Sequence, residues 1–141
     1  MSYNIAVLDI GKTNKKLFVY DDQLRCLNPE ETGQQFDPVS WETPGGEELE
    51  CDNMTAIQKW MMESLGEAAE QYGNIRAISI STHGATVAFL GDTPNRVFDG
   101  DGGLVFPVIS YENEIDEEMD KSFYEQIGMT PQEAQRRTAT P

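Results

Sequence analysis

Two short apolar runs within residues 5–20, IAVLDIGKTNKKLFVY, constrain the fold of this chain more than any other feature. A polar loop that contains Gly11 joins the two runs, and this pattern predicts a β-hairpin. The first run, residues 5–8, shows no alternation of apolar and polar residues. We therefore expect this strand to be buried on both faces, in the middle of a sheet.

The loop of this hairpin has residues that suit a phosphate site. Gly11 allows the backbone to approach a ligand, and Thr13, Asn14 and the loop N–H groups can donate to phosphate oxygens. Asp9 ends the first strand as a lone carboxylate that needs a partner, and a hydrated Mg²⁺ is one candidate. The alternative is an ordinary hairpin with a solvated turn and an aspartate that accepts from backbone donors. The spacing alone favours this alternative.

The length and charge of the chain limit its fold and its partners. A chain of 141 residues is expected to form one domain. Its 25 acidic and 10 basic residues give a net charge of −15, which argues against nucleic acid or an anionic membrane as partner. The charge does not argue against ATP, because loop amides and a metal can bind its phosphates.

Nothing in the sequence has the pattern of a signal peptide or of an 18-residue apolar span. The two cysteines, Cys26 and Cys51, lie in different segments without the spacing of metal ligands. We therefore expect a cytoplasmic protein in which both thiols are reduced.

The clearest predicted helix is Met54–Tyr72, where apolar residues recur at steps of three and four and form one stripe that packs on the sheet. Asp52 or Asn53 is expected to cap its start. Gly73 is expected to end it in a left-handed conformation.

Further strands are predicted at residues 34–43, 75–82, 86–90 and 104–111, the first of them an edge strand because it contains a proline. A second helix is predicted over about residues 114–127, and a third begins after Thr130. The second helix is expected to bury Ile115, Met119, Phe123 and Ile127. This order of elements predicts an α/β or α+β fold with a mixed sheet and helices. Residues 99–103 are rich in aspartate and glycine but lack the glutamate of a calcium loop, so we expect a turn there.

Two later stretches carry candidate binding residues. Residues 81–84, Ser-Thr-His-Gly, end a predicted strand with the single histidine of the chain, His83, which can hydrogen-bond a hydroxyl. The alternative is a turn histidine bound to the local backbone. Residues 107–114, PVISYENE, end another predicted strand with an aromatic residue and carboxylates. Here the alternative is the acidic start of a solvated helix.

These three stretches resemble sugar kinases of the FGGY family, which belong to the actin, hexokinase and Hsp70 superfamily. They are DIGKTNKKLFVYD, STHG and PVISYENE, in the order and spacing of the family. The resemblance covers essentially the whole chain, but the chain covers only part of the family's length. It implies an actin-like (ribonuclease H-like) fold, with residues 1–141 as the front part of an incomplete N-terminal kinase domain.

The resemblance also implies roles for the three stretches. The hairpin loop would bind the phosphates of ATP and, through water, a Mg²⁺ ion at Asp9, and the other two stretches would line the sugar pocket. The phosphate and metal residues would be Asp9, Gly11, Lys12, Thr13, Asn14 and Lys15. The sugar residues would be Thr82, His83, Gly84, Tyr111, Glu112 and Asn113. Asn113 stands where the family usually has an aspartate, and this departure leaves the identity of the sugar open.

Kinases of this family transfer the γ-phosphoryl group of MgATP to a sugar hydroxyl, whose proton is taken by an aspartate. No residue here matches that aspartate, which lies downstream in the family, so we expect this chain by itself to be inactive. The alternative is a stand-alone module with an actin-like half-fold. Such a module would bind a sugar or a protein without catalysis and would cover its apolar surface in a homodimer.

Overall fold

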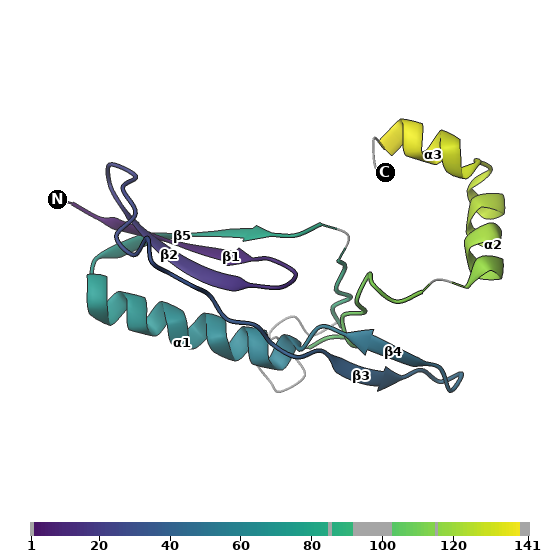
Figure 1. The fold of residues 1–141 in the computed structure, drawn as a ribbon, viewed down its shortest axis with the longest axis horizontal. Helices are drawn as coiled ribbons and strands as arrows, with labels where there is room; N and C mark the ends of the chain where they lie inside the picture. Colours follow the sequence, from purple (N-terminus) through teal and green to yellow (C-terminus); the bar gives the residue numbers. More distant parts are fainter. Residues whose placement is uncertain (1, 85, 92–102, 115, 139–141) are drawn as a thin grey trace. The chain divides into compact units, whose positions relative to one another are not determined.

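A computed structural model describes residues 2–84, 86–91, 103–114 and 116–138 (Figure 1). The chain divides into two compact units, Met1–Tyr111 and Glu112–Pro141, and each is described by itself. One domain over residues 1–141 stays a prediction.

The predicted hairpin is confirmed as the antiparallel pair of β1 (Asn4–Ile10) and β2 (Lys15–Asp21). On its other side β1 pairs in parallel with β5 (Ile75–Thr82). The sheet order is therefore β2-β1-β5, with β1 in the middle as predicted (Figure 1). The sheet is mixed, because β2 runs antiparallel and β5 parallel to the central strand.

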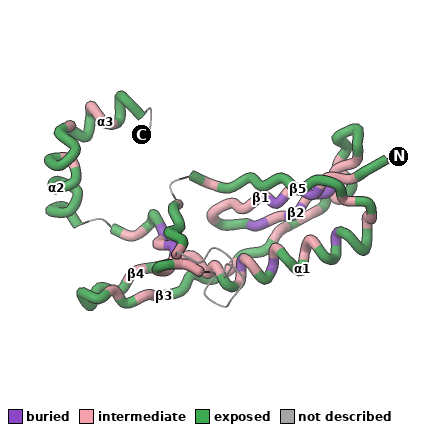
Figure 2. Tube along the Cα trace, turned by 180° about the vertical axis from the view of Figure 1, so that it is seen from behind, coloured by how far each residue is buried: buried purple, intermediate pink, exposed green. Residues whose placement is uncertain are grey.

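Only one face of β1 is fully buried. Ala6 and Leu8 are 0% and 1% exposed, whereas Val7 is only half-buried. The expectation of burial on both faces is therefore half right. The reason is that α1 (Met54–Tyr72) packs against β1 and β2 from one side (Figure 2). Since side chains alternate along a strand, the residues of the opposite parity receive no cover from this helix.

The helix α1 matches its predicted bounds and supplies the core. Trp60 and Ala68 pack against Leu8, Leu17 and Val19 of the hairpin, which makes this apolar cluster the main source of stability in the first unit. Residues of α1 that lie on the predicted stripe thus form the core, although Ala69 is exposed.

The start of α1 is as predicted, whereas its end differs slightly from expectation. Asn53 is the cap residue, since its Oδ1 accepts from the N–H of Ala56 at 3.1 Å. The helix ends at Gly73 with φ 61° and ψ 174°, so φ is positive as expected, but the conformation is not the left-handed helical one.

The outer edge of β2 is covered by irregular backbone rather than by a strand. The side-chain amide of Asn28 bonds both the N–H of Val19 and the carbonyl of Leu17, each at 2.8 Å. Gln34 and Lys15 exchange two backbone hydrogen bonds of 2.8 Å. These contacts pair the edge groups of β2 that would otherwise lack partners.

The edge strand predicted at residues 34–43 is present but shorter. It is β3 (Val39–Glu42), which pairs antiparallel with β4 (Glu48–Cys51) in a separate two-stranded sheet. We did not predict β4, because its run of glutamates resembles a loop. Cys51 at its end is fully buried, and burial raises the pKa of its thiol.

The strands predicted at residues 86–90 and 104–111 are wrong for the residues that the structure describes, where only isolated bridges occur. Residues 103–111 instead return as an irregular segment, which we call the return segment. Backbone hydrogen bonds attach it to β4 and to Asp52, just before α1: the N–H of Ser110 donates to the carbonyl of Glu50 at 2.9 Å, and the N–H of Asp52 donates to the carbonyl of Val108 at 2.8 Å. Pro107 removes a donor in its middle, which explains the failed strand pattern. Most of the turn predicted at residues 99–103 lies outside the described residues.

The second unit contains α2 (Glu117–Ile127) and α3 (Pro131–Thr138). Asp116 caps α2, Gly128 ends it in the left-handed conformation, and Thr130 caps α3 as predicted. The predicted burial of Met119, Phe123 and Ile127 is wrong, because these side chains are 64%, 55% and 39% exposed. Two short helices offer no second layer for that stripe, and Ile115 lies outside the described residues. Within the described residues, no helix is both long and apolar enough to cross a membrane.

The core cluster makes a direct prediction about stability. Leu8→Ala removes a side chain that is 1% exposed, so the free energy of unfolding should fall by about 2–5 kcal/mol in urea denaturation. Leu24→Ala is the matched control, since Leu24 is 72% exposed and should change the value by less than about 0.5 kcal/mol. Equal effects of the two substitutions would contradict the assigned core.

Candidate functional site

Two of the three predicted stretches lie side by side because β1 and β5 are parallel. Ile10 at the end of β1 is opposite Thr82 at the end of β5. The N–H of His83, which follows, donates to the carbonyl of Ile10 at 3.2 Å. The carboxyl ends of parallel strands meet at one edge of a sheet, so the hairpin loop and the histidine turn share that edge.

The third stretch reaches the same place. Nζ of Lys12, in the hairpin loop, donates to Oγ of Ser110 at 2.7 Å and lies 5.3 Å from the centre of the Tyr111 ring. The ring of His83 meets the same tyrosine edge-on, with 5.9 Å between ring centres. Each predicted stretch thus contributes at least one side chain to a single contact group, and the third contributes two, Ser110 and Tyr111.

Sequence reasoning missed two members of this group, Ser110, which precedes Tyr111 in the chain, and Asp52. Asp52 comes from outside the three stretches. Its Oδ1 lies 3.5 Å from Nζ of Lys12, and the two side chains are only 13% and 21% exposed. We considered Asp52 only as a helix cap. Of Asp52 and Asn53, only one can be the helix cap, and Asn53 fills that role. The sequence therefore left Asp52 as an acidic residue without an assigned role, and this was the available signal. We call Lys12, Asp52, His83, Ser110 and Tyr111 the Tyr111 cluster.

Both ring nitrogens of His83 are bonded to local groups. Nδ1 lies 3.2 Å from the carbonyl oxygen of Ile10, which can only accept, so Nδ1 carries the proton. Nε2 then accepts from the hydroxyl of Thr86 at 2.9 Å. This arrangement agrees with the turn-histidine alternative. A sugar hydroxyl could bond Nε2 only by replacing the hydroxyl of Thr86.

Lys15 lies beneath the loop rather than at its surface. It is 3% exposed, and its Nζ donates to the carbonyl of Lys12 at 2.7 Å. Burial lowers the pKa of Lys15, an effect that the charge of Asp52 opposes and the charge of Lys12 strengthens. Gly11 closes the same turn by donating to the carbonyl of Asn14 at 3.0 Å, and a Cβ at Gly11 would come within 3.0 Å of that oxygen. The loop therefore has a fixed shape with little space for a larger residue.

Asp9 lies on the other face of the sheet from Lys15. The register places Asp9 opposite Lys16 and Ile10 opposite Lys15, and side chains alternate along both strands. In the part of the chain that the structure describes, no group of three acidic, histidine or cysteine side chains could hold a metal. A magnesium ion near Asp9 would therefore complete its shell with water and ligand oxygens, as this ion commonly does.

The remaining predicted site residues divide between the two units. Thr13 and Asn14 are exposed in the loop, where Oδ1 of Asn14 accepts from Gln35 at 3.0 Å. Thr82 and Gly84 are exposed on either side of His83. Glu112 and Asn113, which follow Tyr111 in the chain, belong to the second unit.

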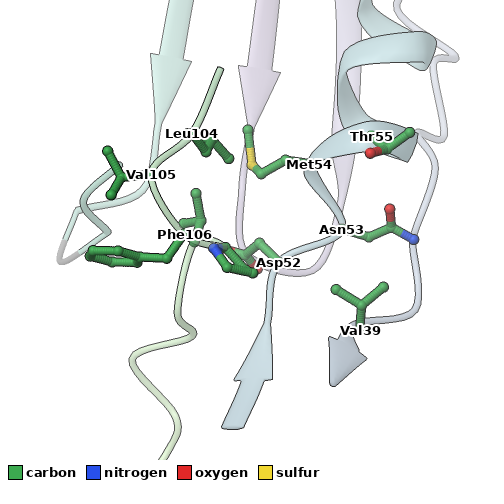
Figure 3. Close-up of a pocket in the computed structure, with 10 residues that line it drawn as sticks. Val39, Asp52, Asn53, Met54, Thr55, Leu104, Val105 and Phe106 are labelled. Atoms are coloured by element: carbon green, nitrogen blue, oxygen red, sulfur yellow. The ribbon is translucent and has the colours of Figure 1, made fainter. Parts of the chain in front are cut away.

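An open cavity of about 480 Å³ borders the cluster through Asp52 (Figure 3). Val39 of β3, the start of α1 and the return segment line it, and Figure 3 shows these side chains. Its apolar part includes Phe106, whose ring stacks on Trp41 with 6.1 Å between centres. The volume lies in the range of small-molecule sites. Sequence reasoning did not find this cavity, because its apolar lining comes from a segment that we predicted as a strand.

The fold is similar to that of two solved kinases. A carbohydrate kinase from Novosphingobium aromaticivorans matches 86% of this chain with 25% identity and a TM-score of 0.64. A gluconate kinase from Lactobacillus acidophilus matches 91% with 18% identity and a TM-score of 0.59. No model of a known protein family matches the sequence, and neither does any curated protein.

These similarities define the class of fold. The predicted α/β class, a mixed sheet with flanking helices, is confirmed, and the solved structures that share it are carbohydrate kinases. The chain matches only 22% and 23% of the lengths of those two proteins. The likeness therefore concerns a part of a kinase, as predicted.

The buried ammonium of Lys15 gives a pH-dependent prediction. The pKa of Lys15 is lowered in the folded state from its ordinary value of 10.5. As the pH rises towards 10.5, the folded state therefore loses this proton before the unfolded state does. The free energy of unfolding of the wild type should therefore rise with pH in this range relative to Lys15→Met. Urea denaturation at several pH values measures this difference. Lys16→Met, which keeps Lys15, is the control and should follow the wild type, whereas parallel curves for wild type and Lys15→Met would contradict the assignment.

Proposed function

We propose that this chain forms part of a carbohydrate kinase that transfers the γ-phosphoryl group of MgATP to a sugar hydroxyl. The observation that carries the proposal is the Tyr111 cluster, in which Lys12, His83 and Tyr111 come together from three separate stretches. The likeness to a carbohydrate kinase at 25% identity supports it.

In this proposal the sugar contacts the cluster through Tyr111. The ring is 49% exposed although Lys12 and His83 contact it, so part of it remains accessible to a ligand. Aromatic rings provide a large contact area at low entropic cost, which suits the C–H groups of a sugar ring. Thr82, His83 and Gly84 would contact hydroxyls beside it. Glu112 and Asn113, which follow Tyr111 directly, would add a carboxylate and an amide.

The phosphates of ATP would bind at the hairpin loop. Lys12 and Lys15 bring two positive charges to this region, which offset the negative charges of Asp9 and Asp52 in a chain of net charge −15. Gly11, Thr13 and Asn14 would provide close approach and polar donors. Asp9 would hold magnesium through water. When bound, MgATP supplies the phosphoryl group and the metal charge that neutralises it.

We assign no residue of this chain as the base that takes the hydroxyl proton. The described groups bind and orient the sugar, and we propose that the base comes from outside residues 1–141. The chain by itself should therefore bind a sugar without turnover.

A second candidate function is a non-catalytic binding module. The observation that favours it is the exposure of Ile78 and Ile80 on β5, at 57% and 58%, which would suit a protein partner or a second copy. The kinase proposal remains the better supported one, because the likeness to a carbohydrate kinase at 25% identity supports it in addition to the Tyr111 cluster.

Sugar binding and ADP release test the proposal together. We expect a panel of pentoses, hexoses, deoxy sugars and sugar acids to include a ligand that stabilises the chain against heating, by about 2.7 kcal/mol at 100 times its Kd. Tyr111→Leu should abolish this stabilisation. Tyr3→Leu, which changes a tyrosine that is 41% exposed in the same unit, should retain it.

Two outcomes would contradict the proposal in different ways. Stabilisation by no member of the panel would remove the sugar site. ADP release above background from this chain with MgATP and a sugar would show that it contains its own base, contrary to our assignment.

A further inference from the structure

We propose that Lys12 is a positioning residue that holds the ring of Tyr111 for the sugar, and that Asp52 and Ser110 hold Lys12 in place. This inference rests on the proposed sugar site and changes the role of Lys12 within it. The resemblance to kinases assigns Lys12 to the phosphates, and it assigns no role to Asp52 or Ser110.

The first step of the argument is that Tyr111 lies in irregular backbone. It ends the return segment, which has isolated bridges but no strand, and its side chain is half-exposed. A ring in such a position loses rotational freedom when a ligand binds, and this loss weakens binding. Contacts that already hold the ring in the free protein reduce the loss.

The second step is that Lys12 provides such a contact. Its Nζ lies 5.3 Å from the ring centre, within the range of a cation–π interaction, and donates to Oγ of Ser110 at 2.7 Å. Ser110 is 2% exposed and its N–H donates to Glu50 of β4 at 2.9 Å, so it is a fixed point next to Tyr111 in the chain. One ammonium group thus holds both the backbone before the ring and the face of the ring.

The third step is that Asp52 fixes the ammonium. The carboxylate lies 3.5 Å from Nζ at the start of α1, and both side chains are largely shielded from water. Attraction between the two charges is stronger there than at an exposed surface. A lysine whose ammonium is held by an aspartate, a serine and an aromatic ring is better suited to fix its neighbours than to follow the moving charge of a phosphoryl group.

A binding experiment separates this role from direct phosphate contact. For the sugar found with the wild-type chain, Lys12→Met and Asp52→Asn should each weaken Kd by about tenfold, while the Kd for MgATP changes by less than about twofold. The double variant should bind the sugar no more weakly than either single variant, because both remove the same support. Lys12→Arg should restore most of the affinity, since a guanidinium can bond Asp52 and cover the ring. Lys16→Met, which removes a lysine of the same hairpin outside the Tyr111 cluster, is the matched control and should leave the Kd for the sugar unchanged.

A second measurement detects the contact without any ligand. Protons of the Lys12 ε-carbon should show an upfield NMR shift from the ring current of Tyr111. The shift should vanish in Tyr111→Leu and decrease in Asp52→Asn and Ser110→Ala. The NMR shift is compared only among variants whose thermal unfolding remains cooperative. If Asp52→Asn does not fold, Ser110→Ala alone tests the support of the ammonium group.

The outcomes distinguish the inference from the function on which it rests. Sugar binding by the wild type with equal affinity in Lys12→Met overturns the positioning role, as does a loss of MgATP affinity alone. A wild type with the NMR shift but without any sugar ligand overturns the proposed sugar site, and the contact then stands without that role. An ordinary Lys12 signal in the wild type overturns the contact itself.

Discussion

Parallel pairing of β1 with β5 is the constraint on which the site depends, because it brings the carboxyl ends of both strands to one edge. Asp9 and Ile10 lie opposite Ser81 and Thr82, so the hairpin loop and the histidine turn begin at the same level. The pairing in turn depends on the cluster of Leu8, Leu17 and Val19 under α1, which fixes the register of β1 and β2. A shift by one residue would expose these side chains and place Lys15 on the opposite face.

The same register explains how positive charge is placed in an acidic chain. Lys15 faces the side of the sheet that α1 covers, and its ammonium group is buried under the loop, where it holds the carbonyl of Lys12. Burial of a charge is unfavourable unless hydrogen bonds compensate, so this lysine sacrifices some stability for the shape of the loop. Asp52 lies within Coulombic influence of both Lys12 and Lys15. One carboxylate from the start of α1 therefore links the helix to the hairpin loop electrostatically.

Local patterns predicted those elements that depend on local physics. The hairpin, the bounds of α1 and β5, and the end of α2 at Ile127 follow from periodicity and from single residues that start or stop an element. The failures depend on tertiary contacts. Residues 104–110 read as a strand, but Pro107 breaks the donor pattern and the segment bonds to β4 and Asp52 instead. Asn53 caps α1, and Asp52 instead faces Lys12. The sequence does not show which of two adjacent capping residues is used.

The chemistry of the Tyr111 cluster determines what kind of effect it can have on a reaction. The ring of Tyr111 and the ammonium group of Lys12 would contact a ligand in the same way before and during a phosphoryl transfer. Neither group gains charge or accepts a proton in that step. Such contacts bind ground state and transition state alike, so they lower KM or Kd without raising kcat. Acceleration needs groups that face the reacting hydroxyl and gain strength as charge develops there. Both ring nitrogens of His83 already have hydrogen-bond partners, Ile10 and Thr86, so a ligand hydroxyl would have to replace one of them. In the proposed function the cluster would therefore select and orient the sugar, and the transfer step would belong to other groups.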